Sequence, residues 1–406
     1  MSTPPPSPPR LVVPPHGDEV LPWRRQDGRR SEIDEYTASI PPLIAGLDLA
    51  VPADLLERCR AAQLEVAVLE RRRADEVGVL EPFLLRTEAI ASSRIEDELT
   101  TVDQLARVQH GLAGPRSART VMGAVDGLRL LVERGARGVE LDDVLAAHRP
   151  LMADDPYERH DAGKLRVVQN WISGSDRSPL GAVHVPPAPA RVPELMDDLV
   201  AFMRRTDLDP VVQAAVAHAQ FESIHPFHDG NGRLGRSLIN AVWRYRGTTT
   251  RMAVPIASAI VADREEYFGL VNHYRTGDAE AFCAYLAEAT ARSAVEAEVS
   301  AQRLAELPAR WHEEVRPRAG SAAATLLQLL PSSPVVDASD VARLTGASTA
   351  RAYATITRLV EAGVLRPITA SRRDAAWAAG DVLDEADLLV DRLRLRRMRE
   401  RATQDH

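Results

Sequence analysis

Apolar residues recur at helical spacing through most of this chain. Leucines and valines three or four positions apart predict helices over 52–73, 82–95, 102–112, 118–134, 141–153, 192–204 and 210–224, with another beginning after Gly232. Pro82 is expected in the first turn of its helix. The stretch 263–314 is also expected to be helical, with a break near Pro308. The pattern therefore predicts a mainly α protein.

Two stretches depart from the helical pattern. Residues 165–172 and 182–187 are rich in β-branched side chains and flank a Ser-Gly-Ser-Asp sequence, which predicts a β-hairpin with a long loop. Near the C-terminus, two short helices around a glycine turn are predicted over 339–362, followed by two strands with a tip at 371–374. This order resembles a winged helix-turn-helix domain.

These patterns suggest four consecutive parts. We expect a flexible proline-rich arm at 1–35, an N-terminal helical region at 36–115, a helical core with the hairpin at 116–318, and a winged-helix domain with a basic tail at 319–406.

Composition narrows the class of protein. The 406 residues are 45% hydrophobic and 27% charged, enough to bury a sizeable core, and the net charge of −8 argues against a general nucleic-acid coat or a membrane-surface protein. Two distant cysteines cannot build a disulfide framework or a zinc site. The sequence has no signal peptide and no apolar run of about 18 residues, so we expect a cytoplasmic protein. The single lysine, Lys164, is followed by leucine, which excludes a P-loop.

One segment concentrates residues suited to binding phosphate. Residues 225–236 read His-Pro-Phe-His-Asp-Gly-Asn-Gly-Arg-Leu-Gly-Arg and are expected to form a turn leading into a helix. Gly230 and Gly232 allow the backbone amides to form an anion nest at the helix N-terminus. Arg233 and Arg236 are three residues apart and share one helix face. Two guanidiniums above such a nest suit a polyphosphate better than a single carboxylate.

Other side chains of the segment supply further chemistry. Asp229 is a hard oxygen ligand suited to Mg²⁺, and His225 has the pKa range of a general base. Asn231 could donate to a phosphate oxygen, and Phe227 could anchor the loop in the core. Taken singly, each of these residues is more often part of an ordinary turn.

Together they resemble the defining motif of the Fic (Fido) family, His-Pro-Phe-x-Asp/Glu-Gly-Asn-Gly-Arg-x-x-Arg, at every specified position. The resemblance implies a protein adenylyltransferase that transfers AMP from ATP to a Ser, Thr or Tyr hydroxyl of a target protein. His225 would deprotonate the hydroxyl, and Asp229 would hold Mg²⁺. A phosphorylating relative has Lys in place of Gly232, so glycine favours AMP transfer. The implied ATP-binding residues are Asp229, Gly230, Asn231, Gly232, Arg233, Leu234, Gly235, Arg236, Asn170, Trp171, Ile172 and Tyr267.

The same resemblance assigns a role to two other regions. The hairpin would be the flap that aligns the target segment as an added strand. Upstream, Ser92 and Glu96 match an inhibitory helix motif, Ser/Thr-x-x-x-Glu-Gly/Asn, in which Glu96 would pair with Arg236 and hold ATP unproductively. Some relatives also use this glutamate to remove AMP. The chain departs from the family at Asp97, where Gly or Asn is usual, and at Arg275, where Asn is usual.

The C-terminal module leaves an alternative open. Arg351, Thr355 and Arg358 would face a DNA major groove if this module bound DNA, and the protein would then be a DNA-binding regulator or toxin–antitoxin-like component with a weakly active nucleotide-binding core. Residues 321–406 carry 12 arginines against 11 acidic residues, too little positive charge for strong non-specific binding. A structural, target-docking or homodimer-forming module is the other interpretation.

Overall fold

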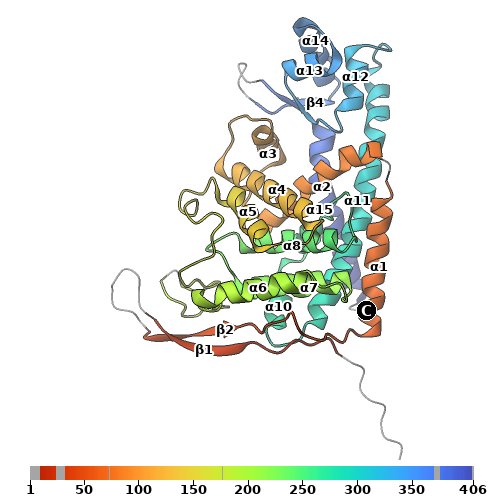
Figure 1. Cartoon of the computed structure of the whole chain (residues 1–406). Helices are drawn as coiled ribbons and strands as arrows, with labels where there is room; N and C mark the ends of the chain where they lie inside the picture. The colour runs from red at the N-terminus through yellow and green to blue at the C-terminus, as the bar shows by residue number, and fades with distance from the viewer. Residues whose placement is uncertain (1–9, 24–32, 73, 176, 370–374, 405–406) are drawn as a thin grey trace, which may run out of the picture. The chain divides into compact units, whose positions relative to one another are not determined.

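The structure is a computed structural model that describes residues 10–23, 33–72, 74–175, 177–369 and 375–404 (Figure 1). The chain forms two compact units, each assembled from separated stretches. The first unit contains residues 1–64, 126–249 and 264–291, and the second contains 65–125, 250–263 and 292–406. The units therefore interleave along the sequence, whereas the sequence pattern suggested consecutive parts.

The first unit is built around a buried helix. Its elements are β1 (Gly17–Pro22), β2 (Glu35–Ile40), α5 (Leu141–Met152), the short η1 (Pro189–Arg191), α6 (Val192–Met203), α7 (Pro210–Ile224), α8 (Asn231–Tyr245) and α10 (Arg264–Tyr274). Asp209 caps α7 by accepting from the backbone amides of Val211 and Val212, and Pro210 supplies a preformed first turn. From Val211 to Ile224 every residue of α7 is buried, because α6, α8 and α10 surround it. The helix thus presents its C-terminal end, and the loop that follows, on a rigid base.

Three helices contribute to both units. They are α1 (Ala53–Glu70), α4 (Arg116–Gly135) and α11 (Glu280–Val315). Within the first unit, α4 crosses α5 closely at Gly127, where an added Cβ would lie 2.7 Å from the carbonyl oxygen of Ala147. Since that oxygen is backbone and cannot yield, only glycine permits this crossing.

The expected flexible arm at 1–35 is wrong for residues 10–23. β1 pairs with β2 as an antiparallel ribbon, with Gly17 opposite Ile40 (Figure 1). Leu11 and Val13 are buried, and the Val13 amide donates to the Gly277 carbonyl. Leu11 and Val13 are thus packed against residues that are distant in sequence, and no local pattern predicts this packing. Residues 1–9 and 24–32 lie outside the described residues.

The predicted hairpin at 165–187 is present in reduced form. Its two segments join at a single antiparallel bridge between Ile172 and His184, through hydrogen bonds of 2.8 and 2.9 Å. The prolines at 186 and 187 have no amide hydrogen to extend the ladder, which limits regular pairing. The turn residue Asp176 is outside the described residues.

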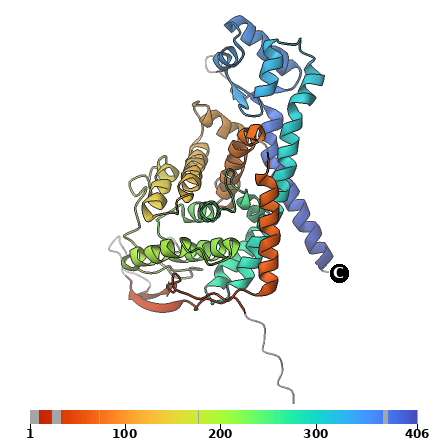
Figure 2. The same cartoon turned by 45° about the vertical axis from the view of Figure 1, so that its right-hand side comes forward.

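The second unit holds a helical half and the C-terminal module. The helical half comprises α2 (Ala74–Ile95), α3 (Val102–Gln109), α9 (Ile256–Ala262) and α15 (Gly380–Gln404). The C-terminal module runs in the order α12 (Ala322–Leu329), β3 (Val335–Val336), α13 (Ala338–Thr345), α14 (Thr349–Glu361), β4 (Leu365–Pro367) and β5 (Trp377–Ala379), with β5 central in the sheet. Figure 2 shows the three helices α12 to α14 gathered together.

Two prolines lie inside helices, at positions that differ from the predictions. Pro82 is inside α2, which begins at Ala74, and not in its first turn. Pro308 is inside α11, which continues to Val315 without the expected break. Leu304, Leu307 and Trp311 are buried around Pro308, so packing retains a helix that proline disfavours locally.

Two of the three side chains expected to face DNA are otherwise engaged. Thr355 is buried, and the Arg358 guanidinium donates to the backbone carbonyls of Val315 and Arg316 at the end of α11. Arg351 and Arg358 are both exposed, but Arg358 is held by these two carbonyls, and the predicted wing tip, 371–374, lies outside the described residues.

The basic run near the C-terminus is not a free positive surface. Within α15, Arg392 pairs with Glu296, and both Arg397 and Arg401 pair with Asp263. These arginines therefore fasten α15 to other parts of the second unit. Among the described residues, no helix combines the length and the apolar character needed to cross a membrane.

Candidate active site

The loop between α7 and α8 is shaped by two left-handed residues. His225, directly after α7, has φ 49°, and Gly230, directly before α8, has φ 79°. A Cβ on Gly230 would lie 2.8 Å from both Leu151 Cδ2 and Met152 Cε of α5. The left-handed backbone favours glycine at 230, and a larger residue would also have to displace the ends of these two side chains. The loop leads into the N-terminus of α8, whose first backbone amides have no partner within the helix, while the Gly230 amide donates to Asp229 Oδ1.

Asn231 holds this loop closed. Its Oδ1 accepts from the Phe227 amide and its Nδ2 donates to the Phe227 carbonyl, each at 2.9 Å. The same Nδ2 lies 3.2 Å from His225 Nδ1. These contacts direct the Asn231 side chain to the backbone of its own loop and to the imidazole. Its backbone N–H remains part of the helix N-terminus.

His225 is held so that one ring nitrogen is available. Its Nδ1 lies 3.0 Å from Asn170 Nδ2, and its carbonyl accepts from Arg166 Nε at 2.9 Å. The described residues give Nε2 no hydrogen bond. Burial, reinforced by the nearby positive charges of Arg166 and Arg275, lowers the pKa of His225 to about 3. The imidazole is therefore neutral near pH 7 and can accept a proton.

A buried cation with unused donors lies at the start of α8. Arg233 is 4% exposed, and its Nη2 lies 3.3 Å from Asp229 Oδ2. Its Nε and Nη1 are buried without a hydrogen-bond partner among the described residues. Arg236, one turn further on, is 1% exposed. Unsatisfied guanidinium N–H groups beside a helix N-terminus fit an anionic ligand, since leaving them unpaired is costly.

Asp229 fits a hard cation. Its side chain is 54% exposed, unlike the buried residues around it. A carboxylate reachable from solvent beside an anion cradle is suited to Mg²⁺ carried by a polyphosphate.

Sequence reasoning missed two residues that position this loop. The His148 ring stacks on the Phe227 ring, with the two ring centroids 3.9 Å apart. Its Nδ1 accepts from the Gly163 amide, and its Nε2 donates to the Asp229 carbonyl at 3.0 Å. Arg166 lies in the 165–187 segment and ties it to the end of α7, because its Nε donates to the His225 carbonyl at 2.9 Å while its Nη2 donates to Pro187 O at 2.6 Å. His148 occupies the apolar face of its helix and Arg166 is one residue of a short strand pattern, so neither carried a signal in the sequence.

The other predicted nucleotide residues are placed as follows. Tyr267 is buried, and its hydroxyl lies 2.7 Å from His218 Nε2. Leu234 is buried, and Gly235 packs on α7, where a Cβ would approach Glu222 Oε1 to 2.9 Å. Trp171 donates from Nε1 to Ser175 O at 2.7 Å. The segment 170–172 thus lies beside the loop through Asn170, while Tyr267 and Gly235 pack against α7.

The residues of the predicted inhibitory motif belong to the second unit. α2 ends at Ile95, and its last turn closes with hydrogen bonds from the Asp97 amide to Arg94 O and from the Glu98 amide to Ser93 O. This is a Schellman ending, with Asp97 left-handed at φ 61°. Asp97 therefore ends the helix in the conformation that the family's Gly or Asn would adopt. Ser92 is buried and Glu96 is exposed.

Comparisons with known proteins agree with this geometry. The Fic/DOC family model matches residues 138–242, a stretch that includes the loop between α7 and α8. Protein adenylyltransferase fic-1 of Caenorhabditis elegans is 27% identical over 277 residues, which are 64% of this chain and 49% of that protein. Protein adenylyltransferase Fic of Nematostella vectensis is 30% identical over 162 residues, 39% of this chain and 34% of that protein. The chain spans about half the length, or less, of these curated relatives.

Solved structures show the same fold. A Fic family protein from Desulfovibrio desulfuricans G20 has a TM-score of 0.53 at 21% identity, covering 81% of this chain and 97% of its own. Fic-1 from Caenorhabditis elegans has a TM-score of 0.50 at 23% identity, covering 62% of this chain and 74% of its own. The chain therefore has the Fic fold.

Proposed function

We propose that this Fic-fold chain is a protein adenylyltransferase that transfers AMP from ATP to a hydroxyl group of a target protein. The observation that carries the proposal is a neutral imidazole at the start of one short loop and a buried guanidinium in the first turn of the helix that follows it. His225 Nε2 has no partner among the described residues, and neither do Arg233 Nε and Nη1. A proton acceptor beside a polyphosphate cradle is what nucleotidyl transfer requires.

The proposed reaction uses the loop residues in order. His225 Nε2 accepts the proton of the acceptor hydroxyl, whose oxygen attacks the α-phosphorus of ATP. The bond from the α-phosphorus to the bridging oxygen breaks, and pyrophosphate leaves with that electron pair. Arg233, Arg236 and the backbone amides at 230–232 hold the phosphates and stabilise their charge. Asp229 would hold Mg²⁺, which supplies charge neutralisation when bound.

Asn170 is proposed to position the base. Its Nδ2 lies 3.0 Å from His225 Nδ1 and also donates to the Phe227 carbonyl at 2.9 Å, so one amide group joins the imidazole to the loop backbone. These contacts fix the orientation of the ring while Nε2 keeps no hydrogen-bond partner among the described residues. The 165–187 segment is proposed to align the target chain, as a flap, beside this pair.

Glu96 is proposed to inhibit the transfer. The proposal is supported by the motif at Ser92 and Glu96. It is also supported by the hydrogen bonds that close the end of α2, because they fix the backbone on either side of Glu96. The family pattern pairs this glutamate with Arg236 in place of the γ-phosphate. The same residue would orient water if the protein also removes AMP.

The test uses ATP labelled at the α-phosphate. We expect weak labelling of protein by the unaltered chain, strong labelling by Glu96→Gly, and none when His225→Ala is added. His228→Ala is the matched control, because this neighbouring histidine is exposed and pairs only with Glu158 among the described residues. Labelling that survives His225→Ala as well as His228→Ala would refute the assignment of the base.

A further inference from the structure

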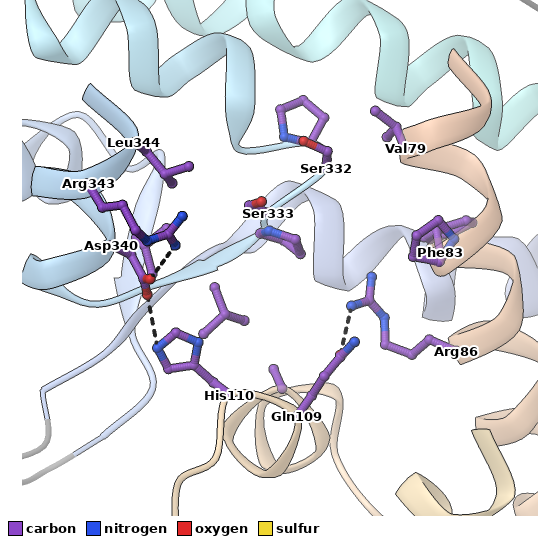
Figure 3. A pocket seen from close by; sticks show the side chains of 16 residues that line it. Val79, Phe83, Arg86, Gln109, His110, Ser332, Ser333, Asp340, Arg343 and Leu344 are labelled. Atoms are coloured by element: carbon purple, nitrogen blue, oxygen red, sulfur yellow. Dashed lines mark hydrogen bonds and ion pairs between the residues drawn. The ribbon is translucent and has the colours of Figure 1, made fainter. Parts of the chain in front are cut away.

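The second unit contains a cleft that is separate from the loop described above. It has a volume of about 240 Å³ and lies between α2, α3, α13 and the loop 331–334 (Figure 3). A water molecule occupies about 30 Å³ in the liquid, so the cleft has room for a small organic molecule. One part of its wall is apolar and is formed by Val79, Phe83, Val335, Val336 and Leu344.

A buried guanidinium forms part of the same wall. Arg86 is 4% exposed, and within the described part of the chain its one hydrogen bond runs from Nη1 to Gln109 Oε1, at 3.4 Å (Figure 3). That acceptor is neutral, and no described carboxylate forms an ion pair with Arg86. Burial lowers the pKa of Arg86 to about 10, which leaves it charged near pH 7. A buried charge without a counter-ion is costly, so its retention calls for a partner.

The acidic residue of the lining does not supply that partner. Asp340 pairs with Arg343 at 2.7 Å and with His110 at 3.3 Å, on the other side of the cleft from Arg86 (Figure 3). Its charge is therefore already offset, and it leaves Arg86 as the uncompensated charge of the lining. Ser333 adds a hydroxyl beside the same space.

We propose that this cleft binds a small organic anion, whose carboxylate or phosphate group pairs with Arg86 and whose apolar part lies against Val79 and Leu344, the partly exposed apolar residues of the lining. Guanidinium suits either head group, because its planar N–H donors match two oxygens at once. The bound anion would contact both α2 and α13, and so would join the helical half of the second unit to its C-terminal module. The binding does not depend on AMP transfer, so either proposal can fail while the other stands.

The experiment is calorimetric titration of the full chain with benzoate, phenyl phosphate and benzamide. Benzoate tests a carboxylate source, phenyl phosphate tests a phosphate source, and benzamide is the neutral control of the same shape. We expect at least one of the two anions to bind and benzamide not to bind. Absence of binding by both anions, or equal binding of benzamide, would overturn the proposal.

Two variants locate the site. Arg86→Met keeps the side-chain length and removes the charge, and should weaken binding by about tenfold to a hundredfold, the value of a charged hydrogen-bonded pair. Gln109→Glu changes an exposed residue, puts a carboxylate beside Arg86 and should abolish binding by competition. It also provides a test if Arg86→Met fails to fold. Arg129→Met is the matched control, since this exposed arginine pairs with Asp126 in the first unit. Unchanged binding in Gln109→Glu would place the anion elsewhere.

Discussion

The pH dependence of AMP transfer follows from the environment of His225. An imidazole with the ordinary pKa of about 6.5 would be only about 9% neutral at pH 5.5. With its pKa lowered to about 3 by burial and by two neighbouring arginines, His225 remains almost wholly neutral there. Lowering the pH from 8 to 5.5 should therefore leave the base fully available, where an ordinary histidine would lose about tenfold of its activity.

The assay is kcat/KM for AMP transfer by the Glu96→Gly variant between pH 5.5 and 8, with the imidazole of His225 followed by ¹⁵N NMR over the same range. An acid limb with a midpoint near 6.5, together with titration of the His225 ring there, would refute the reasoning. If kcat/KM falls at acidic pH while the His225 imidazole does not titrate, the loss of activity belongs to another group.

The lowered pKa of His225 should also make the folding stability depend on pH. Because the folded pKa lies below the unfolded one, the unfolded chain takes up a proton near pH 6.5 that the folded chain refuses. Folding stability should therefore fall as the pH drops below 6.5, by about 1.4 kcal/mol for this residue at pH 5.5. Urea unfolding of the unaltered chain and of His225→Ala measures it. An equal pH dependence in both proteins would contradict it.

Further variants test individual contacts. Gly230→Ala should destabilise the protein by more than Gly247→Ala, because both have left-handed backbones costing about 1–2 kcal/mol for alanine but only Gly230 is also crowded, by Leu151 and Met152; equal urea midpoints would contradict this. Asp97→Gly should be more stable than Asp97→Ala by about 1–2 kcal/mol, since both lose the carboxylate and only glycine adopts φ 61° freely; thermal unfolding compares them, and the reverse order would refute the Schellman ending. Asn170→Ala should lower kcat by about tenfold or more while leaving the KM for ATP nearly unchanged, since Asn170 contacts the base; a change confined to KM would assign Asn170 to nucleotide binding.

Local patterns predicted what depends on local forces. The bounds of α7 follow from Asp209, Pro210 and an apolar run, and they matched the expected 210–224. The loop residues were found because the 225–236 motif is contiguous in sequence. Leu11 and Val13, by contrast, pack on residues more than 260 positions away, and no pattern near them indicates it.

Roles that depend on tertiary contacts were harder to predict. The amide of Asn231 pairs with both backbone groups of Phe227, a contact that residue spacing in the sequence does not indicate. His148 and Arg166 reach the loop from other elements. The sequence showed a basic tail but not its ion pairs, because the acidic partners, Glu296 and Asp263, are distant in sequence.

The proposed function requires that AMP is the group transferred to protein. The most direct measurement incubates the Glu96→Gly variant, in parallel, with ATP labelled at the α-phosphate and with ATP labelled at the γ-phosphate, and compares label retained on protein. We expect protein to retain only the label of the α-phosphate. Retention of the γ-label would indicate phosphorylation, and retention of neither would show that this loop does not catalyse transfer to protein.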